Sequence, residues 1–163
     1  MRFKLFKILV TGLFITMCNA ANAGLLLVEQ YDDYWSADVN LLINYANTNN
    51  ASSSALSEVI DFTDDPAGFA GAIPGSSPWP SANGANLGNS HPLNNTFFAR
   101  ITGEFFTNTA DTYFFQTFND DGVFVFIDGE LVINDPNEHP ETRFEGSKLL
   151  GVGSHSVEYI NLY

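Results

Sequence analysis

Short apolar segments separated by turn residues fill the second half of the chain. They are rich in β-branched and aromatic residues and follow one another after gaps of a few residues, a pattern that predicts strands. These segments are residues 96–106, 111–118, 122–127, 130–134, 147–152 and 155–163. Taken in chain order they predict an antiparallel meander, and we expect an all-β fold, an antiparallel β-sandwich of the jelly-roll kind.

Two of these segments indicate how the sheets are covered. Apolar or small residues occupy the odd positions of 97–104 and a mixed set occupies the even positions, which predicts one buried face. Residues 124–127 include no polar position, which predicts a strand covered on both faces. Asp128-Gly129 follows at once and predicts a two-residue hairpin turn with positive φ at both positions.

The first half of the chain predicts less regular structure. A strand of four or five residues is expected within residues 25–31, and residues 58–62 form a possible second one. Between them Ser36 is expected to cap a short helix that runs to about Tyr45. The apolar residues that recur there at helical spacing are Val39, Leu42, Ile43 and Ala46.

Residues 66–96 predict a long loop, because they contain five of the seven prolines and many Gly, Asn and Ser residues. Loops of this length in compact domains are often functional. Trp79 stands between two prolines as a large aromatic residue of this loop. It either belongs to a lid that covers the core or offers a stacking platform for a sugar ring.

The first 23 residues predict a secretory signal peptide. Arg2, Lys4 and Lys7 form a basic region, an apolar run follows, and small residues precede Gly24. Cys18 also permits a lipoprotein reading, but Met17 stands before it where a small residue is usual. We therefore expect a single domain over residues 24–163, secreted and located outside the cell, in the periplasm or at the cell surface, with no insertion into the membrane once the signal is removed.

The remaining chain is strongly acidic. All 19 acidic residues follow residue 23, against only Arg100, Arg143 and Lys148 as bases. This charge makes nucleic acid and anionic membrane surfaces poor partners and divalent cations favourable ones, although it also suits a soluble surface without any site. Because no cysteine follows Cys18, neither disulfides nor thiolate chemistry contribute to residues 24–163.

Asp120 and Asp121 are the strongest candidates for a binding site. They directly precede a buried strand, so their carboxylates stand at the rim of the sandwich on a rigid element. Together they offer up to four oxygens to a hard cation such as calcium, and Gly122 lets the backbone bend beside them. The other aspartate pairs, 32–33 and 64–65, are expected to be solvated turn residues.

The segment FARITGEFFTNTADTYFFQTFNDDGVFVFIDGELVI, followed by LLGVGSHSVEYINLY, resembles the protective-antigen type (PA14) domain, a lectin-like β-sandwich shared with fungal flocculins. Asp-Asp-Gly, an apolar strand, Ile-Asp-Gly and a later Gly-x-His strand ending in Tyr stand in the family's order. The resemblance covers about residues 97 to 163. Fibro-slime proteins share the same core and are not distinguished from PA14 domains by these residues.

The resemblance implies a calcium-dependent, carbohydrate-binding role in adhesion. In sugar-binding members the two aspartates, here Asp120 and Asp121, are joined by a cis peptide and ligate calcium, which binds vicinal hydroxyls of a glycan. With Gly122 and Trp79 they make up the expected carbohydrate site. The family's other calcium ligands follow the tyrosine that matches Tyr163, so the resemblance implies that the last strand and that loop are not contained in residues 24–163.

Two other readings compete with a lectin. A glycosidase needs two carboxylates about 5 to 9.5 Å apart across a cleft, which neighbouring residues seldom provide, and Ser154 lacks a Gly-x-Ser-x-Gly context. We therefore expect no enzyme. The alternative is a structural or extracellular-matrix module that binds no metal. Asp128 and Gly129 are expected to form a turn only, His139 to have a surface or packing role, and His155 to open a strand.

Overall fold

The computed structural model describes residues 24–58, 62–63, 77–78 and 97–162. The expected signal peptide, Trp79 and all of the predicted loop except residues 77–78 lie outside this part. The described part is built almost entirely of strands, with one short helix, α1 (Val39–Thr48). The strands are β1 (Leu26–Asp32), β2 (Ser53–Ser57), β3 (Phe62–Thr63), β4 (Ser77–Pro78), β5 (Phe97–Thr107), β6 (Asp111–Asn119), β7 (Val123–Ile127), β8 (Glu130–Asp135), β9 (Thr142–Leu150) and β10 (Gly153–Leu162).

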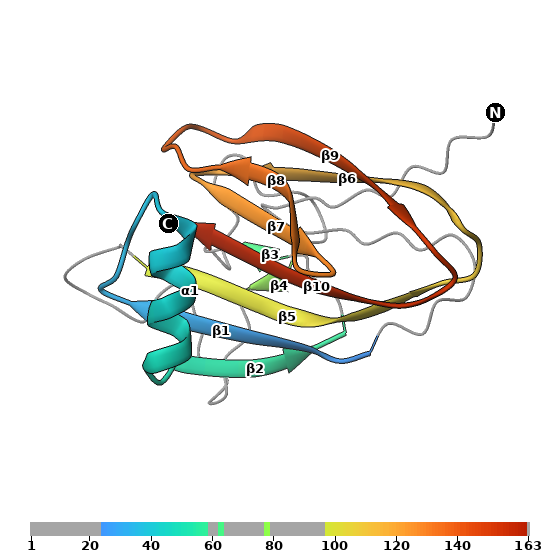
Figure 1. Ribbon diagram of the computed structural model, residues 1–163. Helices are drawn as coiled ribbons and strands as arrows, with labels where there is room; N and C mark the ends of the chain where they lie inside the picture. The colour runs from blue at the N-terminus through green and yellow to red at the C-terminus, as the bar shows by residue number, and fades with distance from the viewer. Residues whose placement is uncertain (1–23, 59–61, 64–76, 79–96, 163) are drawn as a thin grey trace.

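The strands confirm an antiparallel β-sandwich, shown in Figure 1. A six-stranded sheet has the order β2-β1-β5-β10-β7-β8, and β6 and β9 pair in a second sheet. The predicted meander is wrong, because β10 separates β5 from β7 and β6 leaves the larger sheet. The physical reason is that β5 and β6 both carry apolar inner faces, and these meet across the sandwich, with the rings of Phe105 and Phe115 6.2 Å apart.

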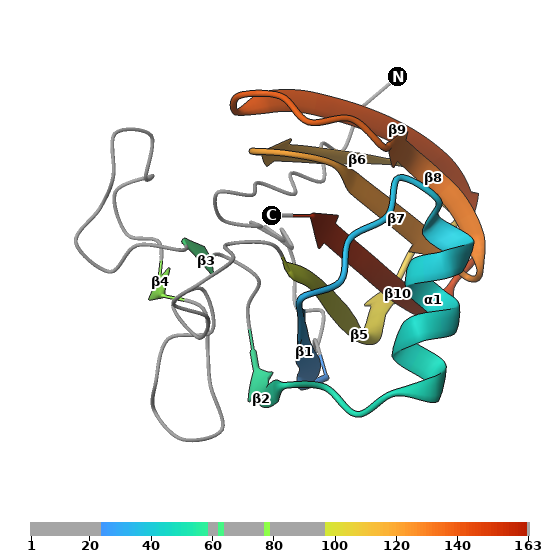
Figure 2. The same ribbon diagram turned by 90° about the vertical axis from the view of Figure 1, so that its left-hand side faces the viewer.

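The buried residues form two clusters, one on each face of the six-stranded sheet. The inner cluster lies between the sheets and contains Val125, Tyr159 and Ile101. The outer cluster lies between the sheet and α1, which crosses the strands near one end (Figures 1 and 2). Phe124 belongs to the outer cluster and Val125 to the inner one, so the prediction that β7 is covered on both faces is confirmed.

The N-terminal elements differ from the prediction in their boundaries. The helix buries Leu42 and Ala46 as expected, but its cap is Asp38, whose carboxylate accepts a hydrogen bond from the Asn40 N–H at 2.9 Å. The Ser36 hydroxyl instead accepts from the Asp38 N–H. The strand Ser53–Ser57 was not predicted, because this short edge strand is polar and shows no apolar alternation. Residues 59–61 of the expected strand 58–62 lie outside the described residues.

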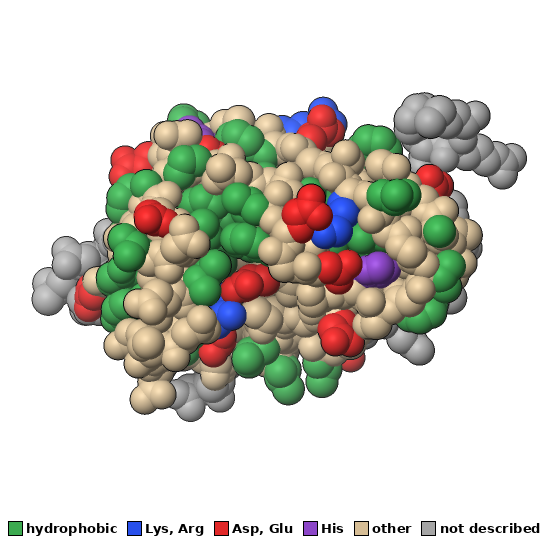
Figure 3. All heavy atoms as spheres, viewed as in Figure 1, with side chains coloured by type: hydrophobic (Ala, Val, Ile, Leu, Met, Phe, Trp, Pro, Cys, Tyr) green, Lys and Arg blue, Asp and Glu red, His purple; other side chains and the backbone are tan. Residues whose placement is uncertain are grey.

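The surface is acidic with few bases, as the composition predicts. Figure 3 shows that the Lys and Arg side chains on this face lie beside Asp or Glu side chains. Arg100 pairs with Glu158 at 2.7 Å, and Lys148 pairs with Glu130 at 2.7 Å. Among the described residues no helix is long and apolar enough to cross a bilayer.

Candidate functional site

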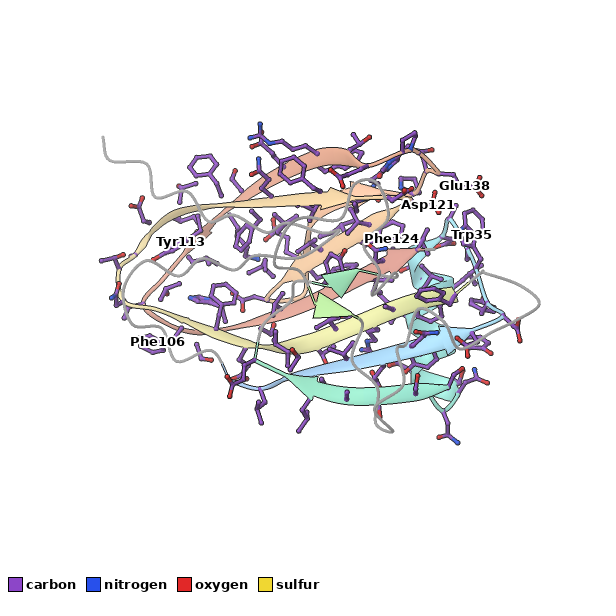
Figure 4. The ribbon with its side chains drawn as sticks, turned by 180° about the vertical axis from the view of Figure 1, so that it is seen from behind. Trp35, Phe106, Tyr113, Asp121, Phe124 and Glu138 are labelled. Carbon is purple, nitrogen blue, oxygen red and sulfur yellow. The ribbon has the colours of Figure 1, made fainter. Side chains whose placement is uncertain are left out.

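The loop that carries Asp120, Asp121 and Gly122 is held by its backbone. It connects β6 to β7 and lies at one end of the sandwich (Figure 4). The Asp121 N–H donates to the His139 carbonyl at 3.0 Å, and the Leu162 N–H donates to the Gly122 carbonyl at 2.8 Å. The Asn119 side-chain amide donates to the Asp121 carbonyl. Two distant parts of the chain and the neighbouring Asn119 therefore fix the loop, while Asp120 remains exposed.

Gly122 is required by close packing. A Cβ atom there would lie 2.8 Å from the carbonyl oxygen of Asp135 and 2.9 Å from Leu162 Cδ1. Both distances are too short for a side chain without movement of the backbone. Gly122 therefore lets the Asp120-Asp121 loop sit directly against β8 and β10, which is a structural role.

The linkage between the two aspartates differs from the one that the family resemblance implies. No peptide bond among the described residues is cis, so the expected cis linkage is wrong for this structure. The chain turns instead at Asp121, whose φ of 62° lies in the left-handed region that Asp tolerates better than most residues. This backbone satisfies the three hydrogen bonds of the loop without a cis peptide.

The electrostatic field at the loop is negative. Burial raises the pKa of the Asp121 carboxyl above its usual range, and the charge of the neighbouring Asp120 raises that pKa further. Glu138 adds to the effect, and a hydrogen bond with the His139 backbone opposes it in part. Figure 4 shows Asp121 and Glu138 at the same end of the molecule. A cation placed here would relieve this repulsion.

His139 has a structural role beside the loop. Its Nε2 pairs with the buried carboxylate of Asp135, its Nδ1 lies 2.9 Å from the Pro140 carbonyl oxygen, and its ring lies against Phe144. Although burial lowers the pKa of His139, the hydrogen bonds to Asp135 and the Pro140 carbonyl and the charges of Asp135 and Asp121 together raise that pKa. Both ring nitrogens face acceptors, so the imidazolium form fits this position. These contacts confirm a packing role for His139.

The donors at the loop fit calcium in kind, because Asp120 and Asp121 supply hard carboxylate oxygens. They do not complete a shell of six to eight oxygens. Over the part of the chain that the structure describes, no group of three or more His, Cys, Asp or Glu residues is arranged to hold a metal. Asp120 and Asp121 would therefore form one side of a shell whose other ligands are water, glycan hydroxyls or further residues.

A second polar cluster lies at the β7–β8 turn. Asp128 and Gly129 have φ values of 52° and 74°, which confirms the predicted hairpin. The Asp128 carboxylate accepts from the Ser156 N–H at 3.0 Å and lies 2.7 Å from His155 Nδ1. His155 Nε2 lies 3.1 Å from the Thr107 hydroxyl, so the cluster ties the turn to β10 and β5.

The Asp128 cluster predicts a loss of stability in acid. Burial raises the pKa of Asp128, but the hydrogen bonds from His155 and Ser156, together with the charges of His155 and Lys148, leave that pKa lowered. The carboxylate therefore stabilises the fold above a pH of about 4, the usual pKa of Asp, and this contribution disappears as the pH falls through the lowered folded-state pKa. The Asp128→Asn variant keeps a residue suited to positive φ, and its melting temperature should fall less steeply below a pH of about 4 than that of wild type. If the melting temperatures of the two proteins fall equally steeply with pH, the Asp128 carboxylate does not stabilise the fold as described.

Part of the chain matches a known family. Residues 80–157 match the family model of the PA14 domain. The resemblance of residues 97 to 163 to that family is thereby confirmed, and no curated protein matches the chain.

Solved structures share the PA14 fold. The chain is 22% identical to a structure named "PA14 sugar-binding domain from RTX adhesin", with a TM-score of 0.57, and the match covers 81% of that chain and 85% of this one. The chain is 13% identical to the PA14 domain of the MpAFP antifreeze protein, with a TM-score of 0.55, and this match covers 78% of that chain and 90% of this one. An anti-sigma factor domain-containing protein is 20% identical with a TM-score of 0.58, but the match spans 38% of its length and 86% of this chain. At these identities the likeness shows the fold.

The fold brings some of the predicted site residues together and places further residues near them. Asp120, Asp121 and Gly122 form one loop as expected, and Trp79 lies outside the described residues. Sequence patterns alone did not single out Asn119, Glu138 or Trp35, which lie in or near this end of the domain. Of these three, only Asn119 carried a usable signal, because it directly precedes the aspartates.

Proposed function

We propose that this chain is an extracellular carbohydrate-binding domain in which Asp120 and Asp121 bind calcium and the calcium contacts glycan hydroxyls. The observation that carries the proposal is the Asp120-Asp121 loop itself. Its backbone is fixed from three sides, and its carboxylates repel each other at an end of the domain where the added charge of Glu138 favours a cation. The PA14 domain of the RTX adhesin, which is named for sugar binding, supports the same class of function.

The residues of this chain would have separate roles in binding. Asp120, which is exposed, and Asp121, which is half-buried, would hold the cation at the rim of the sandwich. Asn119 and His139 would keep the loop in place through the Asp121 backbone. A bound calcium ion would supply coordination positions for paired hydroxyl groups of a sugar. Binding of this kind is weak at each site and suits adhesion through many copies.

Calcium should raise the melting temperature of the protein. Extracellular calcium sites have dissociation constants of about 10⁻⁴ to 10⁻³ M, so calcium at about 10 mM should stabilise the fold by about 1.4–2.7 kcal/mol. For a domain of this size that is a shift of about 4–8 °C, reversed by a chelator. Asp120→Asn and Asp121→Asn should each abolish the shift. Magnesium at the same concentration is expected to shift the melting temperature little, because it demands a tighter octahedral shell.

The matched control is Asp111→Asn, which removes an exposed carboxylate at the start of β6, whose hydrogen bond goes to the adjacent Thr112 N–H. It should keep the full calcium shift. A glycan array probed with the wild-type protein, with calcium and with chelator, then tests the sugar. If calcium shifts neither the wild-type nor the variant melting temperature, the chain is a structural module without metal and the proposal fails.

A further inference from the structure

Two exposed aromatic side chains lie at opposite ends of the domain. Trp35, on the loop between β1 and α1, is 37% exposed, and Phe106, near the end of β5, is 47% exposed. They are the aromatic members of the exposed large hydrophobic set in the described part of the chain. Figure 4 shows Trp35 at the end that carries Asp121 and Glu138, and Phe106 at the far end. A large exposed aromatic residue beside a polar site is a feature of ligand binding.

The register of the sheet places the two loops that carry Trp35 and the aspartates at the two ends of one row of residues. Tyr31 of β1 pairs with Phe98 of β5, and Phe98 pairs with Leu162 of β10. The Leu162 N–H in turn donates to the Gly122 carbonyl, so these residues form one row across the sheet. The row spans three strand spacings, which is about 14 Å. The chain leaves this row toward Trp35 on one side and toward Asp121 on the other.

The loop that carries Trp35 is held on both sides of that residue. The Tyr34 ring stacks on Tyr45 of α1 at 3.9 Å and packs in the outer cluster with Phe124. After Trp35, the Ser36 hydroxyl accepts a hydrogen bond from the Asp38 N–H, and Asp38 caps the helix. The Trp35 backbone is therefore fixed between a partly buried ring and a helix cap. A side chain presented in this way loses little conformational freedom when a ligand binds.

We infer that Trp35 forms a second sugar subsite, and that the ligand of this domain is an oligosaccharide rather than a single sugar. The inference rests on the proposed function. One sugar would contact the calcium held by Asp120 and Asp121. Tyr31 and Gly122, near which the two loops leave the sheet, lie about 14 Å apart, which is wider than one hexose ring, so a ring over Trp35 would belong to another residue of the same glycan. The apolar C–H face of that sugar would lie on the indole ring.

Affinity measurements separate the two subsites. The probes are the oligosaccharide bound most strongly on the glycan array and the methyl glycoside of the sugar in it that requires calcium. Trp35→Ala should raise the dissociation constant of the oligosaccharide about tenfold, as truncation of a central tryptophan does in other interfaces. The dissociation constant of the methyl glycoside should stay within about twofold of the wild-type value. Trp35→Tyr should recover most of the loss. Phe106→Ala, the control at the far end, should bind both probes like wild type.

Fluorescence offers an independent readout, because the whole chain contains two tryptophans, Trp35 and Trp79. Trp79→Phe leaves Trp35 as the reporter, and Trp35→Phe leaves Trp79. The oligosaccharide should change the emission of the Trp79→Phe protein, in which Trp35 is the reporter, and the methyl glycoside should not.

The outcomes distinguish this inference from the proposed function. If the oligosaccharide binds only with calcium but Trp35→Ala has no effect on it, the second subsite is wrong and the calcium site stands. If the emission change comes from Trp79 alone, the second subsite again fails. If wild type binds no glycan with calcium, both are overturned. A normal calcium shift in the melting temperature of Trp35→Ala shows that this variant is folded.

Discussion

Phe124→Ala should reduce the free energy of unfolding by about 3–5 kcal/mol, the usual cost of removing a buried aromatic ring. Phe124 is 1% exposed and packs in the outer cluster with Tyr31, Phe98 and Leu162. A domain is typically stable by only about 5–15 kcal/mol, so this one change removes a large share. Because Phe124 follows Gly122 by two residues, its loss should also loosen the Asp120-Asp121 loop.

Urea denaturation of wild type and variant measures the effect of Phe124→Ala. The control is Phe106→Ala, which removes the same side chain from a position that is 47% exposed and should cost less than about 1 kcal/mol. The loss in free energy of unfolding for Phe124→Leu should lie between those of the two alanine variants. If Phe124→Ala and Phe106→Ala cost the same, the outer cluster does not stabilise this end of the domain as described.

Gly146→Ala is the second large effect, with an expected loss of about 1–3 kcal/mol or more. Gly146 lies on β9, where that strand approaches β8 of the other sheet. A Cβ atom there would lie 2.2 Å from the carbonyl oxygen of Val132 and 2.7 Å from its Cγ1. The nearest atom belongs to the backbone and cannot rotate away, so relief requires the two sheets to separate at this edge.

The control for Gly146→Ala is Gly151→Ala, because a Cβ at Gly151 meets nothing within 4 Å. That variant should be as stable as wild type to within about 0.5 kcal/mol. Thermal and urea unfolding of the two variants provide the comparison. A small effect at Gly146 would show that β8 and β9 approach each other less closely than the structure indicates.

Local chemistry made most strands from β5 onward predictable, and long-range pairing did not. The expected strand 147–152 was placed too late, because β9 runs from Thr142 to Leu150, and its first half is mostly polar and exposed or half-buried. The alternation in 97–104 and the Asp128-Gly129 turn depend on neighbouring residues only, and both are confirmed. The meander failed because the position of β10 between β5 and β7 joins segments that are far apart in the chain. β2 was missed because a short, polar edge strand carries little apolar pattern.

The candidate site was predictable in part for the same reason. Asp120, Asp121 and Gly122 are adjacent, so their common loop follows from the sequence, and the PA14 family was visible in the motif that contains them. Trp35 and Glu138 reach the same end only through the fold. The sequence Tyr34-Trp35 also gives no indication of which of the two rings packs in the outer cluster, because that depends on where α1 packs.

The shape of the Asp120-Asp121 loop is set by main-chain groups of Asp121 and Gly122, so it is largely independent of the side chains at 120 and 121. Position 120 can therefore be randomised in a display library without remaking the scaffold. Asp121 has a φ of 62°, which restricts that position to residues such as Asn, Gly and Asp. Such a library would allow selection for other ions or other ligands on an unchanged frame.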